Sequence, residues 1–148
     1  MSQHIHLKPV SEILKNLKAD AQPQWGRMSA QHMVEHLTNS VNFSNGKKLL
    51  THNLPEDKAA KAKAFLLSER PMPRGVGANP EAELPALRHE TLEKAIEELQ
   101  EAVQEFETHH LNREIQYAHP AFGKLNKAEW DVFHSKHFTH HLSQFGLL

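Results

Sequence analysis

Apolar side chains recur at three- and four-residue steps along much of the chain, which is the pattern of helices with one buried face. The longest such row consists of Leu92, Ile96, Leu99, Val103 and Phe106. A second row consists of Ala30, Met33, Leu37 and Val41. The two rows predict helices over residues 87–109 and 30–43. Ser29 is expected to cap the start of the helix over 30–43, and Asn45 and Gly46 are expected to end it.

Helix-start signals predict three further helices. Ser11 is expected to be the N-cap of a helix over residues 10–19. A shorter helix is expected over residues 55–67, because a proline and two acidic residues open it. Asn126 is expected to cap a last helix over residues 127–145, with a glutamate three residues later in the capping-box position.

The segments between the predicted helices complete the predicted fold. Residues 70–85 contain four prolines and two glycines, so regular structure is not expected there, and a lid over a site and a plain crossover both fit this segment. No alternation of apolar and polar residues is long enough to predict a strand. We therefore predict an all-α chain, a four-helix antiparallel bundle in which residues 1–148 form a single domain.

Composition narrows the class of protein. The 148 residues include no cysteine, which excludes disulfides and thiolate metal sites. The 17 basic and 18 acidic residues balance, so we expect no nucleic-acid partner. No apolar run approaches the roughly 20 residues of a membrane span, and the polar start, broken by Pro9, is unlike a signal peptide. We expect a cytoplasmic protein with a small-molecule substrate and no membrane partner.

Histidine is the abundant residue type that could carry chemistry, with 13 copies. His134, His137, His140 and His141 all lie in the last predicted helix. His137 and His141 project together from the centre of its apolar stripe, and this four-residue spacing lets two imidazoles reach one metal ion. His134 and His140 fit an outer-shell or a solvated position. The alternative is that all four imidazoles lie at the surface or core edge and bind water.

A metal site generally requires a third protein ligand. The predicted helix over residues 30–43 offers His36, at the flank of its apolar stripe and near the small side chain of Ser40. His32 lies one turn earlier and could pair with His36. Because His32 lies further from the apolar side, we expect it to face solvent.

Three short motifs occur in a defined order along the chain. The first runs from Gln24 to Leu37 and reads Gln-Trp-Gly-Arg-Met-Ser-Ala, then Met-x-x-His-Leu. The second begins at His119 and reads His-Pro-x-Phe-Gly-x-Leu, then Glu-Trp. The third begins at His137 and reads His-x-x-His-His-x-x-Gln-Phe-Gly. Together the motifs resemble an uncharacterised branch of the DinB-like (YfiT-like) metal-binding superfamily.

The resemblance implies a four-helix bundle that binds one divalent ion, zinc or nickel, through His36, His137 and His141. Characterised members of that superfamily include transferases that use low-molecular-weight thiols such as bacillithiol or mycothiol, and a maleylpyruvate isomerase. Members are often dimeric, so the resemblance also raises the expectation of a homodimer. A fold does not transfer a reaction, and no thiol site is identifiable in the sequence.

Two functional hypotheses follow. The first is a metal-dependent transferase of the thiol S-transferase type, or a hydrolase, with His140 and Gln144 as candidates for orienting ligands or substrate. The alternative is a non-catalytic, stress-associated binding module in which a fourth protein ligand closes a structural metal site. A helical interaction protein without a metal is the third option.

Overall fold

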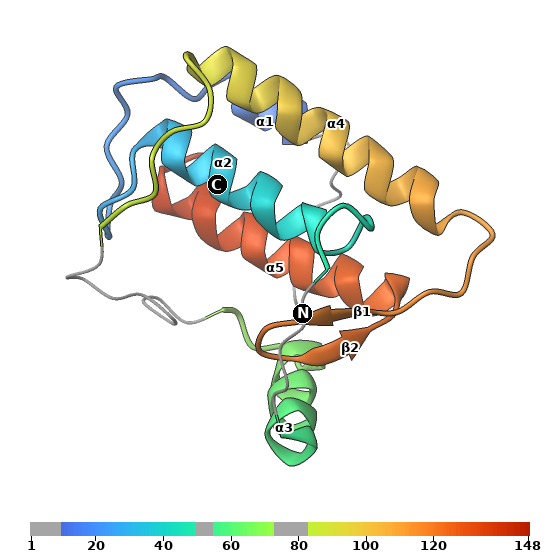
Figure 1. Ribbon diagram of the computed structural model, residues 1–148. Helices are drawn as coiled ribbons and strands as arrows, with labels where there is room; N and C mark the ends of the chain where they lie inside the picture. The colour runs from blue at the N-terminus through green and yellow to red at the C-terminus, as the bar shows by residue number, and fades with distance from the viewer. Residues whose placement is uncertain (1–9, 50–54, 73–82) are drawn as a thin grey trace.

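The chain folds mainly into helices. The computed structural model describes residues 10–49, 55–72 and 83–148 (Figure 1). Its elements, in chain order, are α1 (Val10–Leu14), α2 (Ala30–Asn42), α3 (Glu56–Leu67), α4 (Leu92–His110), β1 (Tyr117–His119), β2 (Gly123–Leu125) and α5 (Lys127–Gln144). The predicted helical fold is confirmed at this level, and all five predicted helices are present with altered bounds.

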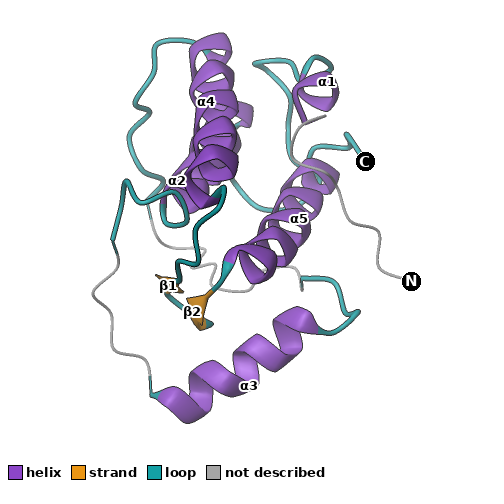
Figure 2. Ribbon diagram, turned by 90° about the vertical axis from the view of Figure 1, so that its right-hand side faces the viewer, coloured by secondary structure: helices purple, strands orange, loops and turns teal. Residues whose placement is uncertain are grey.

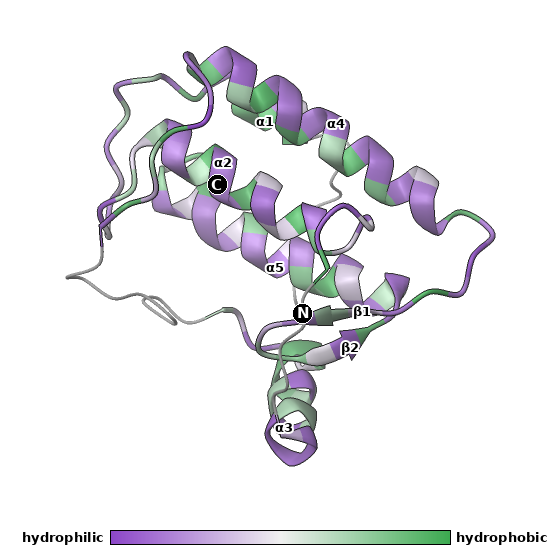
Figure 3. Cartoon of the chain, viewed as in Figure 1, coloured by the Kyte–Doolittle hydropathy of each residue, from purple (hydrophilic) through white to green (hydrophobic). Residues whose placement is uncertain are grey.

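Three helices form the centre of the molecule. Helix α2 lies between α4 and α5, and the short α1 packs against α4 (Figure 1). The largest buried side chains, Phe106, Trp130 and Phe138, come from α4 and α5. Burial of each such side chain contributes about 1.5–3 kcal/mol to folding. Figure 3 shows hydrophobic and hydrophilic residues sharing each of these helices, as burial of one face requires.

Capping side chains set where the site-bearing helices start. Ser29 Oγ accepts a hydrogen bond from the backbone N–H of His32 and caps α2, as predicted. Asn126 and Glu129 form the predicted capping box of α5. These caps satisfy backbone donors that lack partners within the helix, so the starting residue of each helix is well defined.

Two helices differ most from their predicted bounds. Ser11 lies inside α1, so its prediction as an N-cap was wrong, and α1 ends at Leu14 rather than at residue 19. The chain then turns more tightly, with the N–H of Leu17 bonded to the carbonyl of Leu14. Helix α4 begins at Leu92 rather than at residue 87, capped by Thr91.

The late start of α4 has a tertiary cause. The carboxylate of Glu35 accepts hydrogen bonds from the backbone N–H groups of Arg88 (2.7 Å) and His89 (3.3 Å). The segment before α4 is therefore attached to α2 in an irregular conformation, and the helix starts only after it, at the local cap Thr91.

A short antiparallel ribbon was not predicted. Strands β1 and β2 pair with Tyr117 opposite Leu125, and Gly123 adopts a positive φ of 72°. The indole Nε1–H of Trp130 donates to the carbonyl of Tyr117 at 3.2 Å, which fastens the ribbon to α5. Three-residue strands show too little alternation to be recognised in sequence, so the mainly helical prediction missed this ribbon.

Helix α3 lies outside the central layer. It crosses near the start of α5 and contacts α5 and β2 (Figures 1 and 2). The Lys136 ammonium on α5 donates to the carbonyls of Leu66, Ser68 and Arg70 at 2.6–2.7 Å. These carbonyls at and beyond the end of α3 receive a cation in place of the missing helical donors.

Most of the proline- and glycine-rich segment predicted over residues 70–85 lies outside the described residues, so the alternatives of lid and crossover are not decided. No helix among the described residues is long and apolar enough to cross a membrane.

Candidate metal centre

The structure brings together the three histidines that the resemblance selects. His36 comes from α2, and His137 and His141 come from successive turns of α5. The ring centroids are 4.8 Å apart for His36 and His137, 4.8 Å for His36 and His141, and 4.7 Å for His137 and His141. The three imidazoles therefore form a nearly equilateral triangle between the two helices.

The nitrogen atoms of this triangle are close enough to share an ion. Nε2 of His36 and Nε2 of His137 are 3.0 Å apart, and one ligand atom from each ring lies within 4.8 Å of the others. Two nitrogens bound tetrahedrally at 2.0–2.1 Å are separated by about 3.3 Å. The first pair already has nearly this spacing, and a small movement of the side chains would bring all three ligand atoms to one ion. The donor set therefore fits a divalent ion.

The surroundings of the three imidazoles lower their pKa values and so favour the neutral form. Burial lowers the pKa of His137 well below its usual value, and the neighbouring histidines lower it further. Burial lowers the pKa of His141 to about 3. His36 is exposed at the pocket, but its ring packs against His137 and His141, and this partial desolvation also lowers its pKa. A neutral imidazole has a free lone pair, whereas a protonated one does not, so all three rings are suited to metal binding at neutral pH.

The orientations of the two buried rings have different causes. Nδ1–H of His141 donates to Gln144 Oε1 at 2.9 Å, and Gln144 Nε2–H donates to the carbonyl of Trp25 at 2.6 Å. Nε2 of His141 therefore remains available to bind an ion in the triangle. His137 instead stacks on Phe133, with centroids 5.0 Å apart and planes 24° apart, and its buried Nδ1 has no hydrogen-bond partner among the described residues.

Gly26 is a supporting residue to which the sequence analysis gave no role beyond its place in the first motif. Its φ is 82°, and a Cβ atom built there would lie 2.6 Å from Nε2 of Gln144. A side chain at this position would displace the amide that orients His141. The signal in the sequence was present in the Trp-Gly pair that precedes α2, but only the fold brings that pair against α5.

The other candidate histidines do not join the donor group. His134 lies one turn before His137, and its Nε2 is 2.8 Å from Ser44 Oγ. His140 is half-buried, with its ring centroid 5.7 Å from the Trp25 ring and 4.9 Å from the His141 ring. Nε2 of His32 bonds to the carbonyl of Pro85 at 3.0 Å. In the part of the chain that the structure describes, no fourth histidine or carboxylate joins the triangle.

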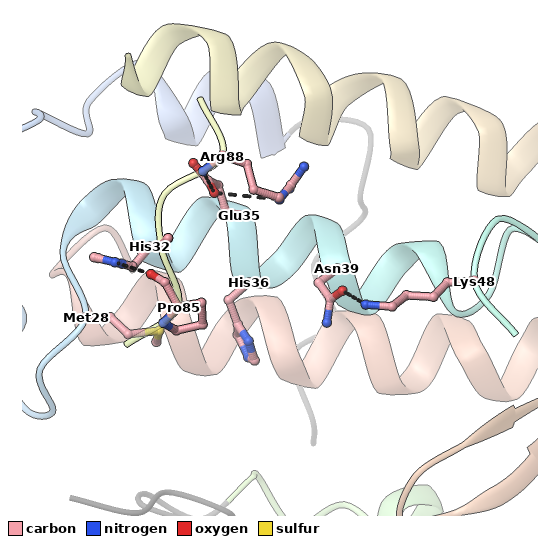
Figure 4. Close-up of a pocket in the computed structure, with 9 residues that line it drawn as sticks. Met28, His32, Glu35, His36, Asn39, Lys48, Pro85 and Arg88 are labelled. Carbon is pink, nitrogen blue, oxygen red and sulfur yellow. Dashed lines mark hydrogen bonds and ion pairs between the residues drawn. The ribbon is translucent and has the colours of Figure 1, made fainter. Parts of the chain in front are cut away.

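A pocket of about 340 Å³ opens beside the triangle. His36 lines it and is exposed, whereas His137 and His141 are buried behind it. Figure 4 shows the His36 ring pointing from α2 toward α5. The segment that carries Pro85 and Arg88 crosses α2 beside it. His36 therefore belongs both to the donor group and to the wall of a solvent-accessible cavity.

The comparisons with known proteins place the chain in a family without assigning a role. The family described as "Protein of unknown function (DUF1569)" matches residues 3–146, so the chain belongs to this family. No curated protein and no solved structure matches it.

Proposed function

We propose that this DUF1569 protein holds one divalent ion, zinc or nickel, on His36, His137 and His141, and that it is a metal-dependent transferase of the thiol S-transferase type or a hydrolase. The single observation that carries the proposal is the triangle of neutral imidazoles with one vertex in an accessible pocket. We also propose that the chain is a DinB-like helical bundle, for which the three motifs and the helix order are the support.

The openness of the site favours an enzyme over the alternative of a structural metal. Structural sites are closed by four protein ligands, whereas catalytic sites use three and keep a position for water or substrate. The donor group among the described residues has three members, and His36 is exposed to the pocket. A bound divalent ion would supply Lewis acidity to an oxygen or sulfur nucleophile.

Some side chains of the site would bind the ion, and others would orient those ligands. His137 and His141 are fixed in the interior by Phe133 and Gln144, so they would bind with little reorganisation. His36 lies at the solvent side, where ion and substrate would meet. His140 packs on Trp25 beside this group, which is compatible with an outer-shell role.

Metal content of protein purified without a nickel column tests the binding step. We expect about one equivalent in the wild type and a loss of affinity in His36→Ala greater than the roughly 10–100-fold that removal of an outer-shell partner costs. His32→Ala is the matched control, because it removes the same residue type one turn earlier on α2. Equal metal content in the two variants would contradict the proposal.

Cobalt substitution tests whether the site is open. Addition of a small thiol to the cobalt-loaded protein is expected to change its visible spectrum, because an open position admits a new ligand. A spectrum unchanged by any thiol or competing anion would favour the non-catalytic module with a closed structural metal.

A further inference from the structure

The pocket beside His36 contains a lysine that the metal proposal does not use. Lys48 follows α2 and reaches back along it, so that its ammonium donates to Asn39 Oδ1 (Figure 4). The same ammonium lies 5.2 Å from the centroid of the Phe43 ring. Asn39 is one turn beyond His36 on α2, and all three polar residues line the pocket. A cation and an amide therefore adjoin the solvent-facing histidine.

Within the part of the chain that the structure describes, no acidic side chain pairs with this cation. Among the described residues, no carboxylate lies within ion-pair distance of Lys48, whose contacts are a neutral amide and an aromatic face. Lys47 is different, because its ammonium pairs with Glu105 at 2.7 Å. Two adjacent lysines thus have opposite surroundings, and only Lys48 lines the pocket.

The other two charged residues of the pocket are already engaged. Glu35 accepts from the backbone N–H of Arg88 and from the Gln31 side chain. The Arg88 guanidinium makes two hydrogen bonds to Glu98, at 2.6 and 2.9 Å. Arg88 Nε also lies 3.7 Å from Glu35 Oε1, so this one guanidinium pairs with two carboxylates and the three groups keep one negative charge, directed away from Lys48 toward Arg88. Lys48 is the cation lining the pocket that no described carboxylate pairs with.

We propose that the pocket binds a small organic carboxylate, with the carboxylate against Lys48 Nζ and the amide Nδ2 of Asn39 and the rest of the molecule directed toward His36. One part of this proposal, the positive charge of a bound divalent ion, rests on the proposed function. Three neutral imidazoles add no negative charge to a divalent ion, so the complete site would be cationic and would attract an anion.

The geometry favours a carboxylate over a phosphate. One ammonium and one amide match the two oxygens of a carboxylate, whereas phosphate sites gather several donors from arginines or a helix N-terminus. Lys48 Nζ occupies Asn39 Oδ1, so the remaining part of that amide is a donor and not an acceptor. The volume of about 340 Å³ suits a small molecule.

Calorimetric titration of the zinc-loaded protein with succinate tests the proposal. We expect Lys48→Met to raise the dissociation constant about tenfold or more, through loss of a charge-assisted contact. Lys48→Arg retains the charge and is expected to stay within about threefold of the wild type. Lys47→Met is the matched control and is expected to bind succinate as the wild type does. The uncharged diamide of succinate is expected not to bind.

The outcomes separate this inference from the metal proposal. Full zinc content with equal succinate binding in Lys48→Met and Lys47→Met would overturn the inference and leave the metal proposal standing. Absence of zinc from the wild type, with succinate binding still dependent on Lys48, would overturn the metal proposal and support the carboxylate site. Tighter binding of inorganic phosphate than of succinate would overturn the assignment to carboxylates.

Discussion

Two groups of histidines lie along α5, and they have opposite surroundings. The ribbon-side histidines (His110, His119 and His134) each have a hydrogen-bond partner that is not a histidine. Nε2 of His110 is 2.6 Å from the carbonyl of Ser44, and Nδ1 of His119 accepts from the N–H of Ala121 at 2.9 Å. His134 also stacks on Trp130, with centroids 5.3 Å apart. His110 and His134 are buried as core residues, and His119 is half-buried beside them.

The pocket-side histidines (His36, His137 and His141) are arranged around one another. Nε2 of His36 has Nε2 of His137 as its hydrogen-bonding neighbour at 3.0 Å. Two neutral imidazoles can share one proton between them, but three converging rings cannot all be satisfied in this way. Residue type and helix therefore do not separate a core histidine from a candidate ligand, whereas the convergence of three imidazoles on one another does.

Acid is expected to produce the largest effect, because protonation is unfavourable for the buried rings of both groups. The ribbon-side rings would contribute whether or not a metal ion is bound. Burial lowers the pKa of His119 to about 4 and, with nearby positive charges, that of His134 to about 3. The unfolded chain binds protons near pH 6.5. The stability due to these neutral rings is thus full above pH 6.5 and is lost as the pH falls toward their folded pKa values. The two rings together account for about 4 kcal/mol between pH 6.5 and 4.5.

Urea denaturation at a series of pH values measures this loss. The variant His134→Leu removes one of the two rings. The slope of the free energy of unfolding against pH is therefore expected to fall by about 1.4 kcal/mol per pH unit. A free energy of unfolding that stays constant between pH 6.5 and 4.5 would show that these rings are not buried in the neutral form.

Truncation of one histidine from each group sharpens the comparison. His134→Ala empties a fully buried position and is expected to lower the free energy of unfolding by about 2–4 kcal/mol. His36→Ala removes an exposed ring and is expected to change it by less than about 1 kcal/mol in metal-free protein. Chemical denaturation of both variants measures the difference, and equal losses would contradict the assignment of the two groups.

Gln144→Ala tests the orientation of a pocket-side ring. Loss of the amide removes the partner of His141 Nδ1–H, so metal affinity is expected to fall by about 10–100-fold. Competition with a chelator measures the affinity. Ser143→Ala is a neighbouring control that lies outside this hydrogen-bond chain, and a similar loss in that variant would point to a general disturbance of the end of α5.

Ser44→Ala is expected to give the smallest effect. Ser44 Oγ–H donates to the carbonyl of Val41 and its oxygen accepts from His134 Nε2–H. Removal of the hydroxyl is expected to lower the free energy of unfolding by about 1–3 kcal/mol, toward the lower end if water replaces it, and to leave metal content unchanged. Loss of metal from this variant would show that the two groups are coupled.

Much of the fold was predictable because its signals are local. The Ser29 cap and the Asn126–Glu129 capping box set the starts of α2 and α5 within four residues of chain. The i, i+4 spacing by itself places His137 and His141 on one face of a helix. The start of α4 was predicted wrongly, because the carboxylate that holds the preceding segment comes from Glu35, which is 53 residues from Arg88 along the chain.

Periodicity and capping, both visible in the sequence, determined which segments are helical and which imidazoles share a helical face, since both depend on contacts within a turn or two. The tertiary structure alone decided that His36 approaches His137 across 101 residues, that Ser44 engages His134, and that Gly26 makes room for Gln144. Such contacts depend on how whole helices pack, because a side chain's partner in the interior is selected by the shape and burial of every neighbouring element.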